Sequence, residues 1–338
     1  MNGPLRKAAQ AAPRARAAAL TAAATIAVIA AGLAAPPVLG GPALSDEPIQ
    51  PVPLSLHQDP ARAALGRQLF HDARLSANGA VSCASCHNPG QGGVDRRPLS
   101  AGFRGQLTAV NTPTVLNAAL NFRQFWNGRA ATLEAQIEQV VVNPVEMGSS
   151  WPEVVRRLQA DAGYQRAFAA VYRDGVTQAN IVNAIASYER TLITPNARFD
   201  RYLRGEEQAI TAAERAGYLK FKQYGCVACH QGVNVGGNMF QKLGVMNDYF
   251  AARGKLTPAD QGRFLVTGSK DDLYVFKVPS LRNVAASAPY FHDASAATLE
   301  QAVDVMFKYQ LGRVASKEDK AAIVLFLKTL SAEPEGQP

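Results

Sequence analysis

Two short motifs with the same pattern contain every cysteine in the chain. Residues Cys83–His87 read CASCH and residues Cys226–His230 read CVACH. In the pattern Cys-x-x-Cys-His, the two thiols form thioether bonds to the vinyl groups of a haem, and the adjacent histidine binds its iron. A four-cysteine zinc site or a pair of disulfides would use the same cysteines, but neither needs a histidine directly after the second cysteine in both copies.

The motifs therefore predict two covalently bound haem c groups and a redox function. The expected attachment and ligand residues are Cys83, Cys86 and His87 for the first haem and Cys226, Cys229 and His230 for the second.

Length and charge limit the other possibilities. A chain of 338 residues suits two haem domains of ordinary size better than one. The formal net charge of +8 falls to +4 (8 − 4) without the four basic residues among the first 35, which contain no acidic residue. This mild excess is compatible with docking an acidic electron-transfer partner and gives no argument for binding nucleic acid.

Residues 1–35 have the pattern of a secretory signal peptide. Four basic residues precede an alanine-rich apolar run, Ala17–Ala35, which ends in small residues before two prolines. An uncleaved membrane anchor is the alternative, because the run is near the lower length limit for spanning a bilayer. In both cases we expect the folded part in the periplasm, where haem is attached to such motifs in bacteria.

Helix signals recur along the chain. Asp59 before Pro60 marks a helix start, and apolar residues at helical spacing between Ile181 and Leu192 mark another helix. No long alternating run supports a sheet, so we predict a mainly α fold with long loops around the haems. Three further pairs have capping-box spacing, namely Ser150/Glu153, Thr211/Glu214 and Ser316/Asp319.

The polar segment 194–207, which contains a proline, is the expected domain boundary. The motif histidines lie 143 residues apart (230 − 87), one on each side of it, and each is followed by a Gly-Gly pair. The predicted organisation is a signal peptide or anchor at 1–35, an extended leader at 36–56, a first haem domain at 57–199 and a second at 200–332.

The second axial position of each iron decides the function. A methionine there gives a saturated electron carrier, whereas an open position can bind peroxide or dioxygen. Met306 lies on a helix predicted to open at Thr298, and its spacing alone leaves it as either a ligand or a core residue. Met239 and Met246 also follow the second motif. The histidines outside the motifs are His57, His71 and His292, and a lone histidine is more often structural than a ligand.

Several longer segments are characteristic of a known family. They include LGRQLFHDARLS, SCASCHNPGQGGVD, NTPTVLNAA, QFWNGRA, NPVEM, GCVACHQGVNVGG and VPSLRNVAASAPYFHD. With these segments the chain, from Leu65 to its C-terminus, resembles the bacterial di-haem cytochrome c peroxidases of the peroxidase/MauG superfamily. The resemblance implies two cytochrome-c-like domains, with the active site and a calcium ion at their interface.

The resemblance also implies roles for the iron ligands. His87 would bind the peroxidatic haem, and His230 with Met306 would be the axial pair of the electron-transferring haem. Met306 matches the position that separates the peroxidase branch from the MauG branch, where a tyrosine replaces it.

Further site residues are implied in the same way. Glu146 matches the acid/base of the family, and Gln136 and Phe125 match its neighbours in the pocket. Trp126 matches the tryptophan between the haems. The calcium site, which largely uses backbone carbonyls, would include Asn111, Ser287 and Pro289.

One departure from the family pattern concerns the loop after the first motif. Many members place a histidine there that caps the peroxidatic iron until the second haem is reduced. The aligned position holds Phe103, which cannot bind iron. We therefore expect a peroxidatic haem that is open without reductive activation. His71 is the alternative cap, although it precedes the motif at a position usually taken by an aromatic residue.

The function implied is reduction of hydrogen peroxide to water with electrons from a small cytochrome c or a cupredoxin, and the family suggests a homodimer. A MauG-like oxidase of protein side chains is disfavoured by Met306. A non-catalytic di-haem electron carrier or sensor is disfavoured by Glu146 and by the lack of a second ligand for the first iron.

Overall fold

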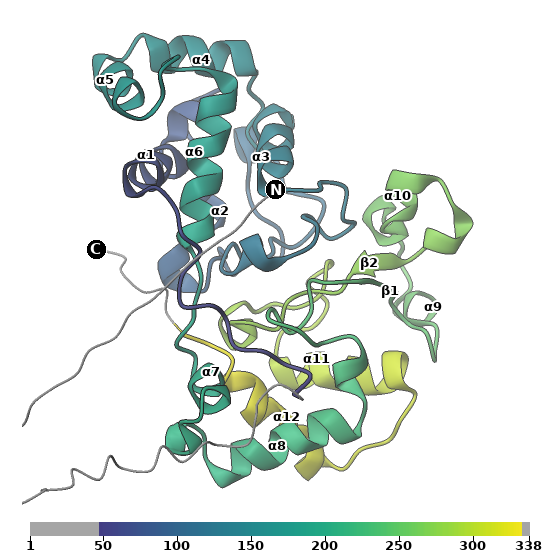
Figure 1. The fold of residues 1–338 in the computed structure, drawn as a ribbon. Helices are drawn as coiled ribbons and strands as arrows, with labels where there is room; N and C mark the ends of the chain where they lie inside the picture. The colour runs from purple at the N-terminus through teal and green to yellow at the C-terminus, as the bar shows by residue number, and fades with distance from the viewer. Residues whose placement is uncertain (1–46, 333–338) are drawn as a thin grey trace, which may run out of the picture. The chain divides into compact units, whose positions relative to one another are not determined.

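The computed structural model describes residues 47–332 (Figure 1). The predicted signal peptide at 1–35 lies outside this range, as does the first part of the predicted leader. Residues 47–56 contain no helix or strand. Within the described range, none of the helices combines the length and the apolar character needed to cross a bilayer.

The prediction of a mainly α fold is confirmed. Among the described residues, regular strands are limited to the antiparallel pair β1 (Phe240–Lys242) and β2 (Val275–Lys277). The helices are α1 (Pro60–Phe70), α2 (Cys83–Cys86), α3 (Leu133–Val142), α4 (Trp151–Gln159), α5 (Ala162–Val171), α6 (Gln178–Thr191), α7 (Arg198–Leu203), α8 (Ala212–Gln223), α9 (Tyr249–Arg253), α10 (Phe264–Thr267), α11 (Leu299–Val305) and α12 (Lys317–Lys328).

The predicted helix starts are correct, but only one of the three predicted capping boxes closes. Asp59 accepts a hydrogen bond from the backbone N of Arg62 at the start of α1. At α8, Thr211 and Glu214 bond reciprocally as predicted. The other two boxes are wrong: Ser150 begins α4 without a side-chain cap, and the Asp319 carboxylate accepts a bond from the Tyr224 hydroxyl, 2.6 Å away, rather than closing the box at α12.

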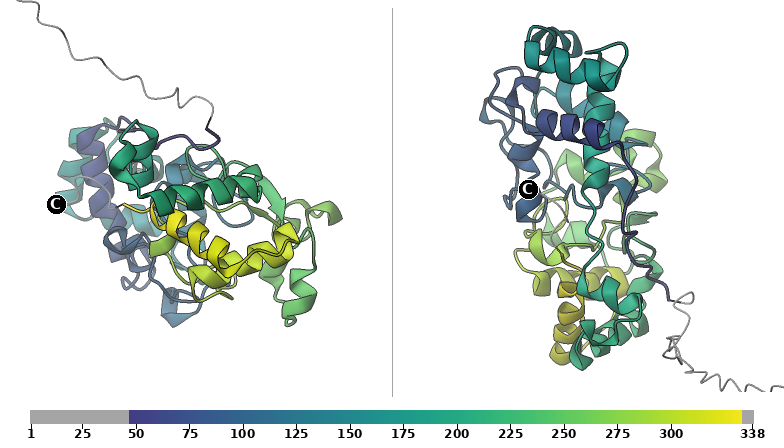
Figure 2. Two further views of the ribbon diagram at one scale, coloured as in Figure 1. Left: turned by 90° about the horizontal axis from the view of Figure 1, so that it is seen from below. Right: turned by 60° about the vertical axis from the view of Figure 1, so that its left-hand side comes forward.

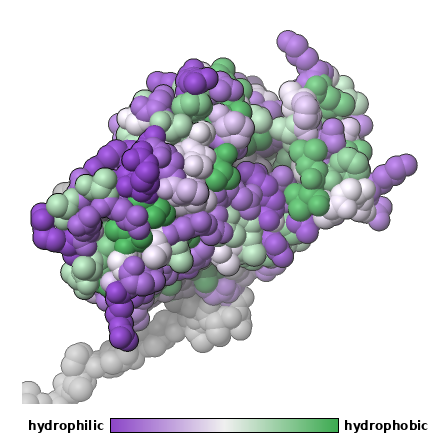
Figure 3. Space-filling model, turned by 90° about the horizontal axis from the view of Figure 1, so that it is seen from above, coloured by the Kyte–Doolittle hydropathy of each residue, from purple (hydrophilic) through white to green (hydrophobic). Residues whose placement is uncertain are grey.

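Buried apolar side chains fall into two main clusters. The first gathers residues between Leu65 and Leu192, mostly from α1 and α3 to α6. The second gathers residues between Phe199 and Leu330, mostly from α7, α8, α11 and α12, together with Ile49. The predicted boundary between residues 199 and 200 stays a prediction. On the face drawn in Figure 3, apolar residues form small separate patches among polar ones.

Each cluster is built around one tightly crossed helix pair, α1 with α6 and α8 with α12. Figure 2 shows α8 and α12 side by side. Gly66 in α1 lies against the backbone carbonyl of Ala184, and Gly217 in α8 lies against that of Ala322. A Cβ at either glycine would collide with backbone, so the close crossing requires glycine in both pairs.

A second repeated feature is a loop that follows the same local path twice. The segments Pro113–Leu133 and Pro279–Leu299 share two left-handed residues, an isolated β-bridge and a helix-capping threonine at a constant offset of 166 residues (283 − 117). The paired positions are Asn117 and Asn283 (φ 59° and 58°), Phe125 and Phe291 (φ 67° and 70°), and Thr132 and Thr298.

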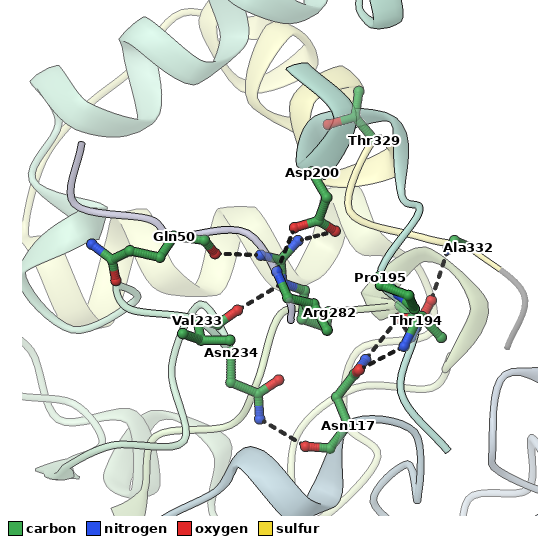
Figure 4. Close-up of polar contacts among 12 residues, drawn as sticks. Gln50, Asn117, Thr194, Pro195, Asp200, Val233, Asn234, Arg282, Thr329 and Ala332 are labelled. Atoms are coloured by element: carbon green, nitrogen blue, oxygen red, sulfur yellow. Dashed lines mark hydrogen bonds and ion pairs between the residues drawn. The ribbon is translucent and has the colours of Figure 1, made fainter. Parts of the chain in front are cut away.

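Buried polar side chains connect these loops to the rest of the chain (Figure 4). Arg282 and Asp200, both 0% exposed, form an ion pair of 2.8 Å. Arg282 also donates to the carbonyls of Gln50 and Val233, and the backbone N of Val52 donates to Asp200. Such a buried pair is tolerated because its hydrogen bonds are satisfied. It fixes the segment before α1 against the loop after the second motif.

Thr194 joins the two repeated loops directly. Its hydroxyl accepts from the amide nitrogens of Asn117, at 2.8 Å, and Asn283, at 3.0 Å. Its backbone N donates to the Asn117 side-chain oxygen. One buried threonine therefore holds the equivalent asparagine of each repeat. Figure 4 shows its contact with Asn117.

Candidate functional site

The second Cys-x-x-Cys-His motif lines a cavity of about 250 Å³. Cys226, Cys229, His230 and Met306 all contribute to its wall. Most of the other lining residues are apolar, among them Phe221, Leu281, Val284, Leu299, Ile323 and Leu327. Two thiols, an imidazole and a thioether around one apolar space are the donor set that a c-type haem requires, so these residues fit the group.

His230 is oriented for metal binding. Its Nδ1 lies 3.3 Å from the carbonyl oxygen of Val235, so this nitrogen carries the hydrogen and Nε2 remains for a metal. Burial lowers the pKa of His230 to about 4, which keeps the imidazole neutral at pH 7. The left-handed glycines after the motif, Gly236 and Gly237, let the loop return close to the histidine.

Met306 stands where α11 ends and a π-helical segment, Met306–Leu311, begins. Thr298 caps α11 as predicted, and its reciprocal partner is Gln301. π-helical turns are rare and frequently occur at functional sites. Met239 and Met246 are absent from the cavity wall, and Met246 is 58% exposed. Of the three methionines after the motif, the structure thus places Met306 at the candidate haem site.

The first motif has the same local construction. Its cysteines, Cys83 and Cys86, begin and end α2, and His87 follows. The Nδ1 of His87 lies 3.4 Å from the carbonyl oxygen of Gly93, and burial lowers the pKa of this histidine as well. These residues fit a second c-type haem on the same grounds.

Glu146 lies just beyond α3, in the segment that carries the predicted acid/base. Burial raises the pKa of its carboxyl group, and the nearby Arg129 guanidinium opposes the rise. Arg129 is held in place because it stacks on the ring of Phe125, 3.2 Å from the centroid, and donates to Gln139 at 3.0 Å. A half-buried carboxylate with a raised pKa near a cation is suited to accepting and returning a proton.

The Phe103 loop packs onto the same segment. The backbone N of Phe103 donates to the carbonyls of Val145, at 3.0 Å, and Glu146, at 2.8 Å, and its ring lies against Gly148. Gln136 is half-buried on α3. Within residues 47–332, no hydrogen bond links Gln136 to Glu146.

The residues predicted between the haems lie on the wall of the second cavity. Trp126, Asn111, Ser287 and Pro289 all line it. The indole Nε1 of Trp126 donates to the carbonyl of Asn111 at 2.8 Å. The Asn111 amide nitrogen donates to the carbonyl of Arg97 at 2.9 Å, which leaves the amide oxygen as the atom that a cation would use.

Of the histidines outside the motifs, His292 also lines this cavity, with its ring centroid 6.2 Å from that of Trp126. His71 is exposed at the end of α1, where its Nδ1 lies 2.9 Å from the Arg67 carbonyl. His292 is buried and bonds Asp260 at 2.7 Å. Ligand atoms of His292, Asp260 and Asp293 lie within 4.8 Å of one another. Arg253 pairs with both carboxylates, so we assign the group as an ion-pair network rather than a metal centre.

Comparison with known proteins identifies the family. Residues 60–208 match the di-haem cytochrome c peroxidase family. The cytochrome c551 peroxidase of Nitrosomonas europaea is 42% identical over 310 residues, which are 91% of this chain and 91% of that protein. The chain belongs to this family. The predicted family resemblance is thereby confirmed.

Other relatives of this di-haem peroxidase family agree. The Escherichia coli cytochrome c peroxidase Ccp is 46% identical over 85% of this chain, although the chain spans only 61% of that protein's length. The Pseudomonas aeruginosa cytochrome c551 peroxidase is 41% identical over 80% of the chain. The crystal structure of a MauG-like protein associated with microbial copper homeostasis has a TM-score of 0.73 and 31% identity, and the match covers 87% of this chain and 95% of that one.

Two residues at these sites were not singled out from the sequence. Arg129 belongs to the QFWNGRA segment, but nothing in its spacing shows that it faces Glu146. Lys277 lines the second cavity. The sequence contains a sign of this burial, because Lys277 is a lone lysine among the apolar residues Val275, Phe276 and Val278.

Proposed function

We propose that this di-haem family member reduces hydrogen peroxide to two waters. The reaction consumes two protons and two electrons, and the electrons come from a small cytochrome c or a cupredoxin. The observation that carries the proposal is the half-buried Glu146 carboxyl group, whose pKa is raised by burial and which lies within electrostatic range of Arg129. A plain electron carrier has no use for such an acid/base group.

Glu146 and Arg129 have separate roles in this reaction. When bound, the haems supply an iron that accepts peroxide and a second iron that stores an electron. Glu146 takes a proton from one peroxide oxygen and returns it to the other, so that water leaves instead of hydroxide. Positioned proton transfer of this kind contributes about 10²–10⁴-fold in rate. Arg129 opposes the rise in the pKa of Glu146 that burial causes, and so favours the carboxylate form.

The first iron is proposed to be open because two positions of the described range from which it could be closed carry no ligand atom. At the repeat offset of 166, the counterpart of Met306 is Val140 (306 − 166), which has no ligand atom. Phe103, which packs against the Glu146 segment, has none either. Absorption and EPR spectra of the oxidised holoprotein test this part. A high-spin first haem is expected, and a low-spin bis-histidine signal would contradict it.

His230 and Met306 would ligate the electron-storing haem, and Trp126 would link it to the first. Support comes from their common cavity wall and from the fixed indole orientation. The amide oxygen of Asn111 and the carbonyls of Ser287 and Pro289 would hold one calcium ion between the two parts.

The setting of the enzyme is proposed from its sequence. Residues 1–35 would export the chain, and the enzyme would work in the periplasm on peroxide that enters there. A homodimer is proposed from the family resemblance alone, and analytical ultracentrifugation of the holoprotein tests it.

Glu146→Gln is the decisive variant for the catalytic proposal. It should lower peroxide turnover with a reduced cytochrome donor by about 10²–10⁴-fold while both haems remain attached. Glu138→Gln, an exposed change on α3, is the matched control and should retain turnover. Full activity of Glu146→Gln would remove the assigned role.

A further inference from the structure

Lys277 is a buried lysine in the wall of the second cavity. It is the last residue of β2 and only 6% exposed. Its backbone N donates to the carbonyl of Trp126 at 2.8 Å, which fixes the strand end beside the tryptophan. Burial lowers the pKa of Lys277 to about 8. The ammonium group is thus taken out of water at the edge of the candidate haem site.

No protein group in the described range neutralises this lysine. None of the ion pairs within residues 47–332 includes Lys277, and its pKa is lowered by burial with no opposing carboxylate. Arg282, the other deeply buried cation of this part of the chain, has Asp200 at 2.8 Å. A buried charge without a partner is strongly unfavourable, so Lys277 requires an anion.

The composition of the cavity wall indicates where that anion comes from. No aspartate or glutamate lines the cavity, and its two lysines are Lys242, which is exposed, and Lys277. Asp260, the buried carboxylate near His292, is already engaged by Arg253 and His292. The anion must therefore arrive with the group that fills the cavity, and haem carries two propionate carboxylates.

We propose that the ammonium group of Lys277 binds a propionate of the haem attached at Cys226 and Cys229. The assignment rests on the proposed second haem site. The residue that would hold the propionate is itself bonded through its backbone N to the carbonyl of Trp126. The counterpart of Lys277 in the first repeat is Asn111 (277 − 166), which is neutral. The second haem therefore receives a positive charge from this position and the first haem does not.

The charge has a measurable consequence. Reduction of a haem adds one negative charge, and a nearby cation in a low-dielectric site stabilises the reduced form. Lys277 should therefore raise the midpoint potential of the second haem. A raised potential helps the second haem to keep its electron until peroxide arrives.

Spectroelectrochemical titration of the holoprotein tests the proposal. Lys277→Met should shift the second haem's midpoint potential downward and leave the first unchanged, whereas Lys277→Arg should retain most of the original value. Lys242→Met, which removes the exposed lysine of the same wall, should give a clearly smaller shift. An unchanged second potential in Lys277→Met, with both haems attached, would overturn the proposal.

A direct measurement covers the case in which Lys277→Met fails to acquire haem. A crystal structure of the unmodified holoprotein should show the Lys277 Nζ within ion-pair distance of a propionate oxygen, and a different partner for Nζ would refute the assignment. The outcome is separable from the peroxidase proposal. Glu146→Gln should lower turnover by about 10²–10⁴-fold without moving the second potential, and Lys277→Met should move that potential whatever happens to turnover.

Discussion

The two haem-motif halves of the molecule share one construction and differ at single positions. Each has a glycine-mediated helix crossing, a motif histidine whose Nδ1 faces a backbone carbonyl, and a copy of the loop with left-handed asparagine and phenylalanine. These shared elements therefore cannot account for a difference in chemistry. The difference must come from the side chains that the two halves place at equivalent positions.

Three such positions carry the contrast. Met306 is matched by Val140, so a thioether is available in one half only. Lys277 is matched by Asn111, so a buried cation is available in one half only. In the third contrast it is the first half that has the ionisable group. Leu327 in the second cavity wall corresponds to the carboxylic acid Glu189 in α6 (327 − 138, the offset between Ala184 and Ala322).

Replacing Met306 by the residue at its counterpart position should have the largest effect on activity. Met306→Val gives the second half the residue of the first, and it should leave the second iron without its thioether. We expect donor-driven turnover to be lost and a high-spin signal to appear at the second haem. Met306→His is the matched control, because it keeps a ligand and should lower the potential while the haem stays low-spin. An unchanged redox titration in both variants would exclude Met306 as a ligand.

The next prediction concerns the vacancy proposed for the first iron. Phe103→His restores the residue type that many family members have in this loop. The oxidised protein should then show a low-spin bis-histidine signal and a lag in peroxide turnover that prior reduction of the second haem removes. Phe103→Leu, which adds no ligand atom, should behave like the unmodified protein. A lag already present in the unmodified protein would contradict the proposal.

Replacing the glycine at either helix crossing by alanine should lower the stability of the two halves equally. Gly66→Ala and Gly217→Ala each place a Cβ against a backbone carbonyl that cannot move without separating the helices. Overpacking of this kind destabilises by about 1–3 kcal/mol. Thermal unfolding of the holoprotein should show a lowered midpoint for both variants. Gly90→Ala, at an exposed position where an added Cβ would meet nothing closer than the Asn88 Oδ1 at 3.5 Å, provides a control for the substitution itself. If only one of the two variants clearly lowered the unfolding midpoint, the two helix crossings would not be equivalent.

How much of the fold and of the site could be predicted from the sequence depends on how far apart in the chain the interacting residues lie. The haem motifs, the caps at Asp59 and Thr298 and the mainly α fold follow from local patterns. The capping boxes at Ser150 and Ser316 failed because Glu153 pairs with Arg157 and Asp319 binds Tyr224, and spacing does not report such competition. Arg129 facing Glu146, and Lys277 without a partner, depend on which loops fold against each other.

Glu189 provides the finest test of the contrast. It is 6% exposed in α6, and burial raises its pKa to about 8. The charged groups around it are Arg190, which lowers the pKa, and Glu134, which raises it, and these two form an ion pair of 2.6 Å. Cys83 also lies within electrostatic range, but it does not titrate once it is bound to haem.

The sign of the pH effect follows from the raised pKa. The folded protein favours the neutral acid, whereas the unfolded chain ionises near its ordinary value of about 4.3. The stabilising contribution is complete below that value and is lost as the pH rises through about 8. The unfolding midpoint of the holoprotein should therefore fall between pH 5 and pH 9 more steeply than that of Glu189→Gln, which cannot ionise. Glu138→Gln should follow the unmodified protein, and parallel curves for Glu189→Gln would show that the half containing the first motif tolerates an ionised carboxylate where the other half places leucine.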